Sequence, residues 1–158
     1  MKHTIQALVE NKFGVLARVS SLFSARGYNI DSLAVGTTED STISCITLVV
    51  NAEDERILEQ IKKQLNKLID VVTVIDLTKR EHIDRELILA KIVLDKKDSR
   101  RILKEIKSKY DVRIVSEKNN VLVLEFVGDN RQTKGFLSEI ENFEIKQLVR
   151  TGRIAMGY

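Results

Sequence analysis

The sequence predicts an α+β fold that consists of two consecutive βαββαβ units within 158 residues. Three observations carry this prediction. Apolar residues alternate with a period of two in some segments and recur every three or four residues in others, which separates strands from helices. These segments follow one another in the same order in both halves of the chain. A charged segment without periodicity, residues 78–84, lies between the two halves.

The first half contains four expected strands and two expected helices. Gly27 is placed to end the first helix in a left-handed conformation, and Asp54 is placed to begin the second helix as its N-cap. The strands are expected at 2–9, 28–37, 42–50 and 71–77. The apolar stripes of the helices are Val15, Leu16, Val19, Leu22 and Phe23, and then Ile57, Leu58, Ile61, Leu65 and Leu68.

The second half repeats this order with little sequence identity. Strands are expected at 86–94, 112–116, 121–127 and 144–149, with a hairpin turn at 118–120. The helices are marked by Ile102, Leu103, Ile106 and Tyr110, and by Phe136, Leu137 and Ile140. Two such units imply two tandem ferredoxin-like domains, each with helices on one face of an antiparallel sheet. We expect a first domain at 1–77, a linker at 78–84 and a second domain at 85–158.

The amino-acid composition indicates the broad class to which the protein belongs. With 43% hydrophobic and 31% charged residues the chain has enough apolar surface for a packed core. No apolar run approaches the roughly 18 residues of a membrane helix, and the first six residues lack the apolar block of a secretory signal. A single cysteine, Cys45, excludes an internal disulfide. We therefore expect a cytoplasmic protein with no membrane partner.

The net charge of +3 is unevenly distributed. Residues 1–76 carry 8 Lys and Arg against 10 Asp and Glu, whereas residues 77–158 carry 18 against 13. This asymmetry indicates two units with different surfaces.

The strands are apolar on both faces, although helices are expected to cover only one. In residues 42–50, for example, Ile46 and Leu48 alternate with Cys45 and Val49. Sheets that are buried on both faces lose clean alternation, and a large bare apolar patch is normally an interface. A second copy of the chain, related by a twofold axis, is the expected cover.

No residue pattern points to catalysis. His3 and His82 have no companions at metal-ligand spacing, so two ordinary, partly exposed histidines are expected and no metal site. Cys45 lies within an expected strand, where a small buried hydrophobe is favoured over a nucleophile. Phosphate-binding glycine loops and the serine hydrolase motif are absent. The sequence therefore predicts no catalytic residue.

The most informative segment is the turn between the first strand and the first helix, residues 10–16. Unpaired N–H groups at the start of a helix favour the binding of an anion. Gly14 has no side chain, so a ligand or another backbone segment can approach the chain closely there. The side chain of Asn11 can both donate and accept hydrogen bonds. An α-amino acid, with its carboxylate and ammonium, suits such a site. Asn29 begins the next strand and is expected to face the same edge. A tight turn that only caps the helix is the alternative.

The residues of this turn also carry a family resemblance. The segment VENKFGVLARV (9–19) resembles the ligand loop of ACT domains. The segment LFSARGYNIDSLAVG (22–36) is similar to the corresponding segment of one branch of the ACT-domain proteins, the acetolactate synthase small subunits. Three further segments extend the resemblance over nearly the whole chain, at 64–71, 85–92 and 150–155.

The resemblance implies a non-catalytic regulatory subunit of acetolactate (acetohydroxyacid) synthase, in branched-chain amino-acid biosynthesis. It places thiamine diphosphate, magnesium and FAD on a separate large subunit and none on this chain. In the family the small subunit activates the large one and confers feedback inhibition, commonly by valine. The first domain would be an ACT domain whose homodimer interface holds the ligand. The implied ligand residues are Asn11, Lys12, Phe13, Gly14, Val15 and Leu16 of one protomer with Asn29 and Ile30 of the other.

Three positions depart from the family pattern. Phe13 and Ser41 stand where proline is frequent, and Cys45 stands where arginine is frequent. Losing a proline loosens the unfolded chain by about 0.4–1 kcal/mol and removes no ligand contact.

Other functions on this fold are disfavoured by the residues. RNA-recognition modules need aromatic residues on central strands, and residues 41–50 have none. A DNA-binding regulator needs an additional helix pair, and a small phosphatase needs an arginine where only Lys12 is present. We therefore expect no nucleic-acid partner. The basic residues of the third helix fit a solvated helix face; they are Lys96, Lys97, Arg100, Arg101, Lys104, Lys107 and Lys109.

Overall fold

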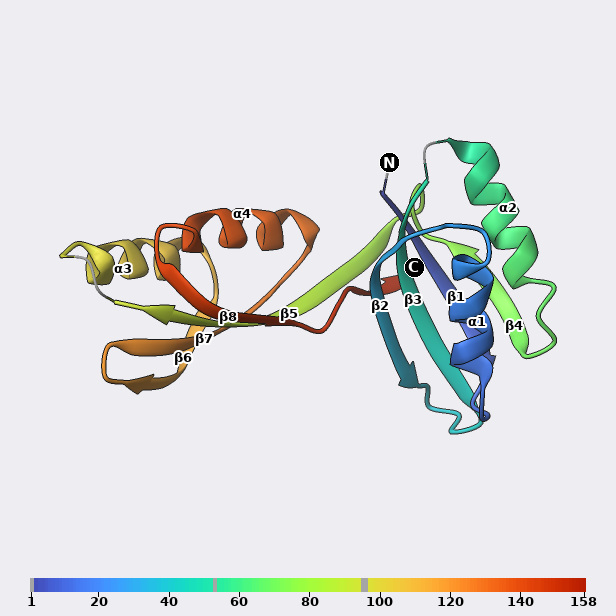
Figure 1. Ribbon diagram of the computed structural model, residues 1–158, viewed down its shortest axis with the longest axis horizontal. Coiled ribbons are helices and arrows are strands. Elements are labelled where there is room, and N and C mark those ends of the chain that lie inside the picture. Colours follow the sequence, from blue (N-terminus) through green and yellow to red (C-terminus); the bar gives the residue numbers. More distant parts are fainter. Residues whose placement is uncertain (1, 53, 95–96) are drawn as a thin grey trace. The chain divides into compact units, whose positions relative to one another are not determined.

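The computed structural model describes residues 2–52, 54–94 and 97–158. The chain divides into two compact units. The first comprises the chain up to Ile83 together with Arg153–Tyr158, and the second comprises Asp84–Gly152. Each unit is a βαββαβ fold with its own hydrophobic core (Figure 1), which confirms the predicted fold class.

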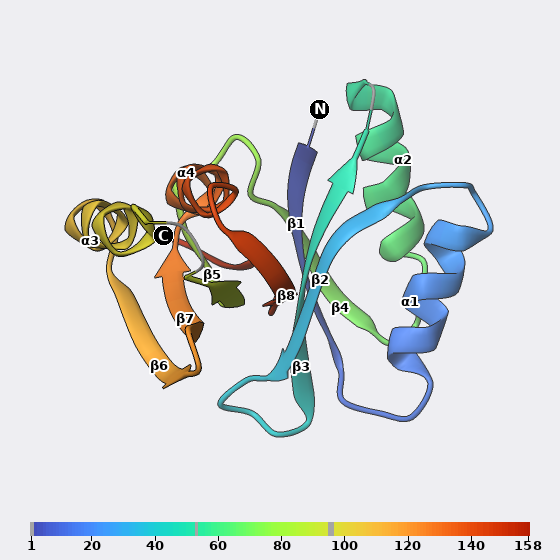
Figure 2. The same ribbon diagram turned by 60° about the vertical axis from the view of Figure 1, so that its left-hand side comes forward.

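The first unit contains a four-stranded antiparallel sheet in the order β2-β3-β1-β4. Helices α1 and α2 lie on one face of this sheet (Figure 2). The elements in chain order are β1 (Lys2–Glu10), α1 (Val15–Ser24), β2 (Ile30–Thr37), β3 (Ile43–Asn51), α2 (Glu55–Leu65) and β4 (Val71–Asp76). Strands β2 and β4 are therefore the two edges, and the unsatisfied backbone groups of an edge strand are available for pairing with another chain.

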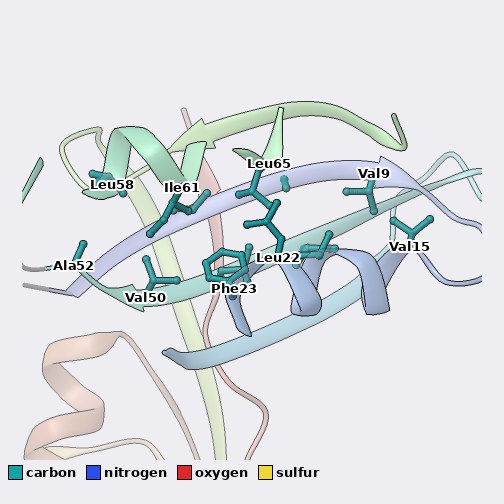
Figure 3. Packing of buried hydrophobic residues seen from close by; sticks show 14 residues of the cluster. Val9, Val15, Leu22, Phe23, Val50, Ala52, Leu58, Ile61 and Leu65 are labelled. Carbon is teal, nitrogen blue, oxygen red and sulfur yellow. The ribbon is translucent and has the colours of Figure 1, made fainter. Parts of the chain in front are cut away.

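The core of the first unit lies between the helices and one face of the sheet, where Phe23, Ile61 and Leu65 pack against Val9 and Val50 (Figure 3). Four of the five residues in the predicted stripe of α1 are buried, but Leu16 is 42% exposed. Leu16 lies on the flank of α1 at its first turn, so it remains available to a ligand or a partner.

The ends of both helices follow from local chemistry. Gly27 has φ +68°, the left-handed conformation predicted for it, and the amide of Tyr28 donates back to the carbonyl of Phe23 at 3.0 Å. The side chain of Asp54 accepts a hydrogen bond from the amide of Ile57 at 2.9 Å, as predicted for the N-cap of α2. This helix ends at Leu65, so Leu68 packs on the core from the following loop.

The second unit has the sheet order β6-β7-β5-β8, with α3 and α4 on one face (Figure 1). Its elements are β5 (His82–Val93), α3 (Ser99–Lys109), β6 (Val112–Lys118), β7 (Val121–Gly128), α4 (Asn130–Ile140) and β8 (Glu144–Arg150). The hairpin predicted about residues 118–120 is present, and its turn is formed by two residues, Asn119 and Asn120, which both have positive φ. A stacked pair of rings, Phe126 and Phe136 with centroids 4.4 Å apart, lies in the core.

Residues 153–158, which we call the C-terminal strap, cross the helix-free face of the first unit. The side-chain amide of Gln6 donates to the carbonyl of Ala155 at 2.9 Å, and the amide of Arg153 donates to Oγ of Ser32 at 2.8 Å. Thr47 and Val49, which lie on this face, are 3% and 2% exposed. A second copy is therefore not needed to cover this part of the sheet, in contrast to our expectation.

Several boundaries differ from the expected ones. Strand β5 begins at His82, inside the predicted linker 78–84, because the alternation of Ile83 with its neighbours continues into the apolar strand. A further strand, β9 (Ile154–Gly157), pairs with β5. Since residues 153–158 belong to the first unit, the second unit ends at Gly152 and not at the expected position 158.

The expected environments of two singled-out residues also need correction. His3 is 3% exposed and buried, not partly exposed, because it lies on the helix side of β1 beside the start of α2. Cys45 is half-buried and accepts a hydrogen bond from the side-chain amide of Gln6 at 3.2 Å. It lies on the helix-free face and not in the core.

Candidate functional site

The turn after β1 is fixed by the neighbouring hairpin between β2 and β3. Asn11 donates from its backbone amide to the carbonyl of Thr42 at 2.7 Å and from its side chain to the carbonyl of Ser41 at 2.9 Å. The hairpin is in turn held by Asp40, whose carboxylate accepts from the amide of Thr42 at 2.9 Å and from its hydroxyl at 2.6 Å. Asn11 therefore keeps its side-chain oxygen as an acceptor while it anchors the turn.

Gly14 occupies the N-cap position of α1 with φ +79°, and no side chain caps the helix. A side chain at this position would be strained, and its Cβ would lie 3.0 Å from Nη1 of Arg18. Among the described residues, the amides of Leu16 and Ala17 have no hydrogen-bond acceptor. The first turn of α1 therefore presents free N–H groups and the positive end of the helix dipole, which suits a carboxylate.

An ion pair connects α1 to the loop before β4. Nε of Arg18 donates a hydrogen bond to Oδ2 of Asp70 at 2.8 Å, and Nη2 forms an ion pair with the same oxygen at 2.7 Å. The carbonyl of Asp70 also accepts from the amide of Glu10 at 2.8 Å. Asp70 is 8% exposed, so a buried acidic residue sets the position of the turn relative to the helix.

Lys12 and Phe13 form the outer side of the turn. Nζ of Lys12 lies 2.8 Å from Oε2 of Glu10, and this hydrogen bond raises the pKa of the lysine. The side chain of Phe13 is fully exposed. Together with Asn11 these residues line an open hollow of about 380 Å³.

Asn29 and Ile30 lie at the other end of the sheet, contrary to the expectation that they face the same edge. Ile30 is opposite Val50 in the β2–β3 ladder, and Val50 is opposite His3 at the start of β1. The turn at Gly14 follows the end of β1. The length of β2 therefore separates the two groups within one chain, by about 23 Å at 3.3 Å per residue.

Three residues of this site were not identified in the sequence. Val35 lies on the helix side of β2, opposite the buried Ile46, yet it is 45% exposed. Arg18 and Asp70 are 52 positions apart, and nothing in their local sequence indicates that they form a pair. The sequence contains one signal that could have identified Val35. It lies two positions after Leu33 in a strand with alternating residues, which places both side chains on the apolar face.

Three of the basic residues of α3 form ion pairs with nearby acidic residues of the second unit. Arg100 pairs with Glu117, Arg101 with Asp98, and Lys109 with Glu139, all on exposed parts of the second unit. Lys96 lies outside the described residues. Among the residues that the structure describes, no group of three or more His, Cys, Asp or Glu side chains could hold a metal ion, and no helix is long and apolar enough to span a bilayer.

Comparison with known proteins identifies both halves of the chain. Residues 5–73 match the family model described as an AHAS small subunit-like ACT domain, and residues 85–158 match the model described as the small subunit of acetolactate synthase. The first match covers the turn at Gly14 and strand β2, and the second includes the C-terminal strap.

Curated relatives match over almost the full length. A probable acetolactate synthase small subunit from Archaeoglobus fulgidus is 42% identical over 99% of this chain and 96% of its own length. The acetolactate synthase small subunit of Mycolicibacterium smegmatis is 40% identical over 98% of this chain and 89% of its own length. The crystal structure of the acetolactate synthase small subunit from Thermotoga maritima matches with a TM-score of 0.85 and 28% identity, covering 100% of this chain and 98% of that one. The chain therefore belongs to the family of acetolactate synthase small subunits.

Proposed function

We propose that this chain is the regulatory subunit that activates the thiamine-diphosphate-dependent large subunit of acetolactate synthase and confers feedback inhibition by valine or another branched-chain amino acid. The chain itself contributes no catalytic residue to this transferase in the cytoplasm. The amino acid binds at an interface between two ACT domains. The observation that carries the proposal is the open N-terminus of α1 at Gly14, beside the end of an edge strand.

The position of β2 accounts for a site that is shared between two copies. Two β2 strands that pair antiparallel across a twofold axis extend the sheet and keep all four helices on the same face. This pairing brings the first residues of one β2 to the last residues of the other. The partner's Asn29 and Ile30 then lie beside the Gly14 turn. They lie on the helix side of the sheet, because Ile30 packs against the core on that side within its own chain.

The chemistry of the residues suits a small zwitterion with an aliphatic side chain. The free amides of Leu16 and Ala17 donate hydrogen bonds to the carboxylate, while the side-chain oxygens of Asn11 and the partner's Asn29 accept hydrogen bonds from the ammonium. The exposed side chains of Leu16 and Val35, with the partner's Ile30, form an apolar wall. An apolar pocket separates ligands that differ by one methylene by only about 1–3 kcal/mol, so leucine and isoleucine remain competitors of valine.

Feedback inhibition requires that the ligand favours one of two arrangements of the holoenzyme. A coupling of about 1–3 kcal/mol between the ligand site and the large subunit gives a 5- to 150-fold effect. Ligand binding at a dimer interface has this property, because it stabilises the paired arrangement of the two ACT domains over any other.

Matched variants on the two edge strands test the proposal. Val35→Lys places charge on the β2 edge, and Val72→Lys places it on the β4 edge, where the side chain is 61% exposed. We expect V35K to weaken dimerisation at least tenfold in sedimentation and to abolish valine binding in calorimetry. V72K should retain both properties. A monomeric wild-type chain, or valine binding that survives in monomeric V35K, would contradict the proposed site.

A further inference from the structure

A groove of about 570 Å³ lies between α1 and α2, which are on the same face of the first sheet (Figure 2). Its base contains Leu22, which is 8% exposed, and the half-buried Leu68. The exposed side chains of Ala17 and Ser21 line it from α1, and Gln64 lines it from α2. We call it the α1–α2 groove. Small side chains above an apolar base leave room there for a segment of another chain.

The charged side chains of the α1–α2 groove are basic. Arg26 follows the end of α1, and its guanidinium donates to two neutral acceptors, Oε1 of Gln64 at 2.9 Å and the carbonyl of Leu22 at 3.4 Å. The ammonium of Lys67, in the loop after α2, has no hydrogen bond or ion pair with any residue that the structure describes. Both cations therefore lack an acidic partner within the described parts of the chain.

Arg18 adds a third positive charge to the groove. Its Nε and Nη2 contact Asp70, which leaves Nη1 without an acceptor among the described residues. Asp70 itself is buried and does not line the groove. The described lining thus has three cations and no acidic side chain, and a concave surface with charges of one sign attracts a partner of the opposite sign.

The shape of the groove favours a protein segment over other anions. An apolar base accepts the apolar side of an amphipathic helix, and the arginine and lysine side chains beside it can pair with acidic residues of that helix. Stacking of nucleic-acid bases requires aromatic rings, and none of the described lining residues is aromatic. Small-molecule sites bury about 70–90% of their ligand, whereas this groove is open to solvent.

From these observations we infer that the α1–α2 groove binds an acidic, amphipathic helix of the large subunit. The inference rests on the proposed function and deepens it, because it assigns the surface through which the first unit meets the large subunit. Helix α1 lies between this groove and the proposed ligand site. Leu16 is part of the ligand site, while Ala17 and Arg18 of the same turn line the groove. A ligand that shifts this turn therefore changes the surface offered to the large subunit.

Activation of the large subunit by charge variants tests the inference. Lys67→Glu reverses one charge of the groove. Lys104→Glu on α3 is the matched control, because Lys104 is also exposed and its ammonium has no partner among the residues described. We expect K67E to raise the chain concentration for half-maximal activation at least tenfold, and K104E to change it less than twofold. Added salt should weaken activation by the wild type more than activation by K67E, because it screens the same attraction. Equal activation curves for K67E and the wild type would overturn the inference.

Photocrosslinking identifies what occupies the groove. Ser21→Cys in a Cys45→Ser background, which contains no other cysteine, places a benzophenone maleimide at the side of the groove. Ser108→Cys, on the exposed side of α3, carries the same label as the matched control. In the reconstituted holoenzyme the S21C label should capture a helix of the large subunit rich in Asp and Glu, at least fivefold more than the S108C label does. Capture of a second copy of this chain, or of a basic segment of the large subunit, would show that the inference is wrong.

Valine binding separates this inference from the proposed function. K67E should bind valine in calorimetry as the wild type does, because Lys67 is not part of the proposed ligand site, and normal binding also shows that the variant is folded. A wild-type chain that leaves the turnover of the large subunit unchanged would contradict both proposals. Activation that K67E and the wild type share equally would contradict the docking surface alone and leave the regulatory function in place.

Discussion

Arg18 of α1 donates a hydrogen bond from Nε to Oδ2 of Asp70, in the loop before β4, at 2.8 Å, and its Nη2 forms an ion pair with the same oxygen at 2.7 Å. The backbone carbonyl of the same aspartate accepts from Glu10, the last residue of β1. One buried residue therefore joins the end of a central strand to the first helix. The turn between them carries Asn11 and Gly14, so its shape depends on this ion pair.

We predict that Arg18→Leu lowers the free energy of unfolding by about 1–2 kcal/mol. The substitution leaves the carboxylate of Asp70 largely buried without its charged partner, although Arg18 itself is half exposed and the loss is smaller than for a fully buried pair. Urea unfolding measures the change. Asp70→Asn in the R18L background should recover part of it. The exposed pair in the second unit is the control, and Arg100→Ala should cost less than about 0.5 kcal/mol.

Gly14 and Gly27 form a matched pair at the two ends of α1. Both have positive φ, +79° and +68°, so Gly14→Ala and Gly27→Ala should each cost about 1–2 kcal/mol of stability. Only Gly14 borders the free amides and Arg18. We predict that G14A weakens valine binding at least tenfold in calorimetry, while G27A binds as the wild type does. Equal affinities in the two variants would mean that Gly14 has no role beyond the turn.

Removal of residues 153–158 should destabilise the first unit and spare the second. The C-terminal strap contributes the hydrogen bonds to Gln6 and Ser32 and covers Val49, which together are worth about 3 kcal/mol. Hydrogen exchange followed by mass spectrometry reports on each unit separately. We expect faster exchange in β1 and β3 of the truncated chain and unchanged exchange in β7. Deletion of Tyr158 alone, which is 89% exposed, should have little effect.

We predict that Asp76 makes the stability of the first unit depend on pH in the acid range. Burial raises the pKa of its carboxyl, but hydrogen bonds from the hydroxyl and amide of Thr78 and the charge of Lys62 outweigh burial and hold it below its ordinary value of 3.8. A carboxyl with a lowered pKa stabilises the fold above its unfolded pKa and loses this effect as pH falls through the folded value. The difference in unfolding free energy between wild type and Asp76→Asn should therefore be largest above pH 5 and shrink below pH 3.8. A difference independent of pH would show that the ionised form is not the stabilising one.

Much of the fold was predictable because periodicity and turn chemistry act locally. The alternating strands, the left-handed Gly27 and the Asp54 cap depend on residues within a few positions of each other, and the structure has them as predicted. Leu16 was placed in the core stripe by its spacing, yet it is exposed. Spacing places a residue near a face of the helix, but the neighbouring elements decide whether that flank is covered.

What could not be predicted depends on contacts between distant residues. The strap returns to Gln6 from 149 positions away, and its short sequence carries no signal for the sheet that it covers. The candidate site shows the same limit. The turn at Gly14 was found from its residue types, whereas the opposite position of Asn29 follows only from the registers of β2 and β3.

Turnover of the reconstituted enzyme tests the central claim most directly. The large subunit is assayed alone, with this chain, and with the Asn29→His variant, each with and without valine, leucine and isoleucine. We predict that the wild-type chain raises turnover and that at least one of these amino acids reverses the gain. The N29H variant should raise turnover equally and resist inhibition, because the larger ring fills the ligand site without altering the surface that meets the large subunit. Inhibition of N29H to the same extent as wild type, or a large subunit whose turnover this chain leaves unchanged, would contradict the account.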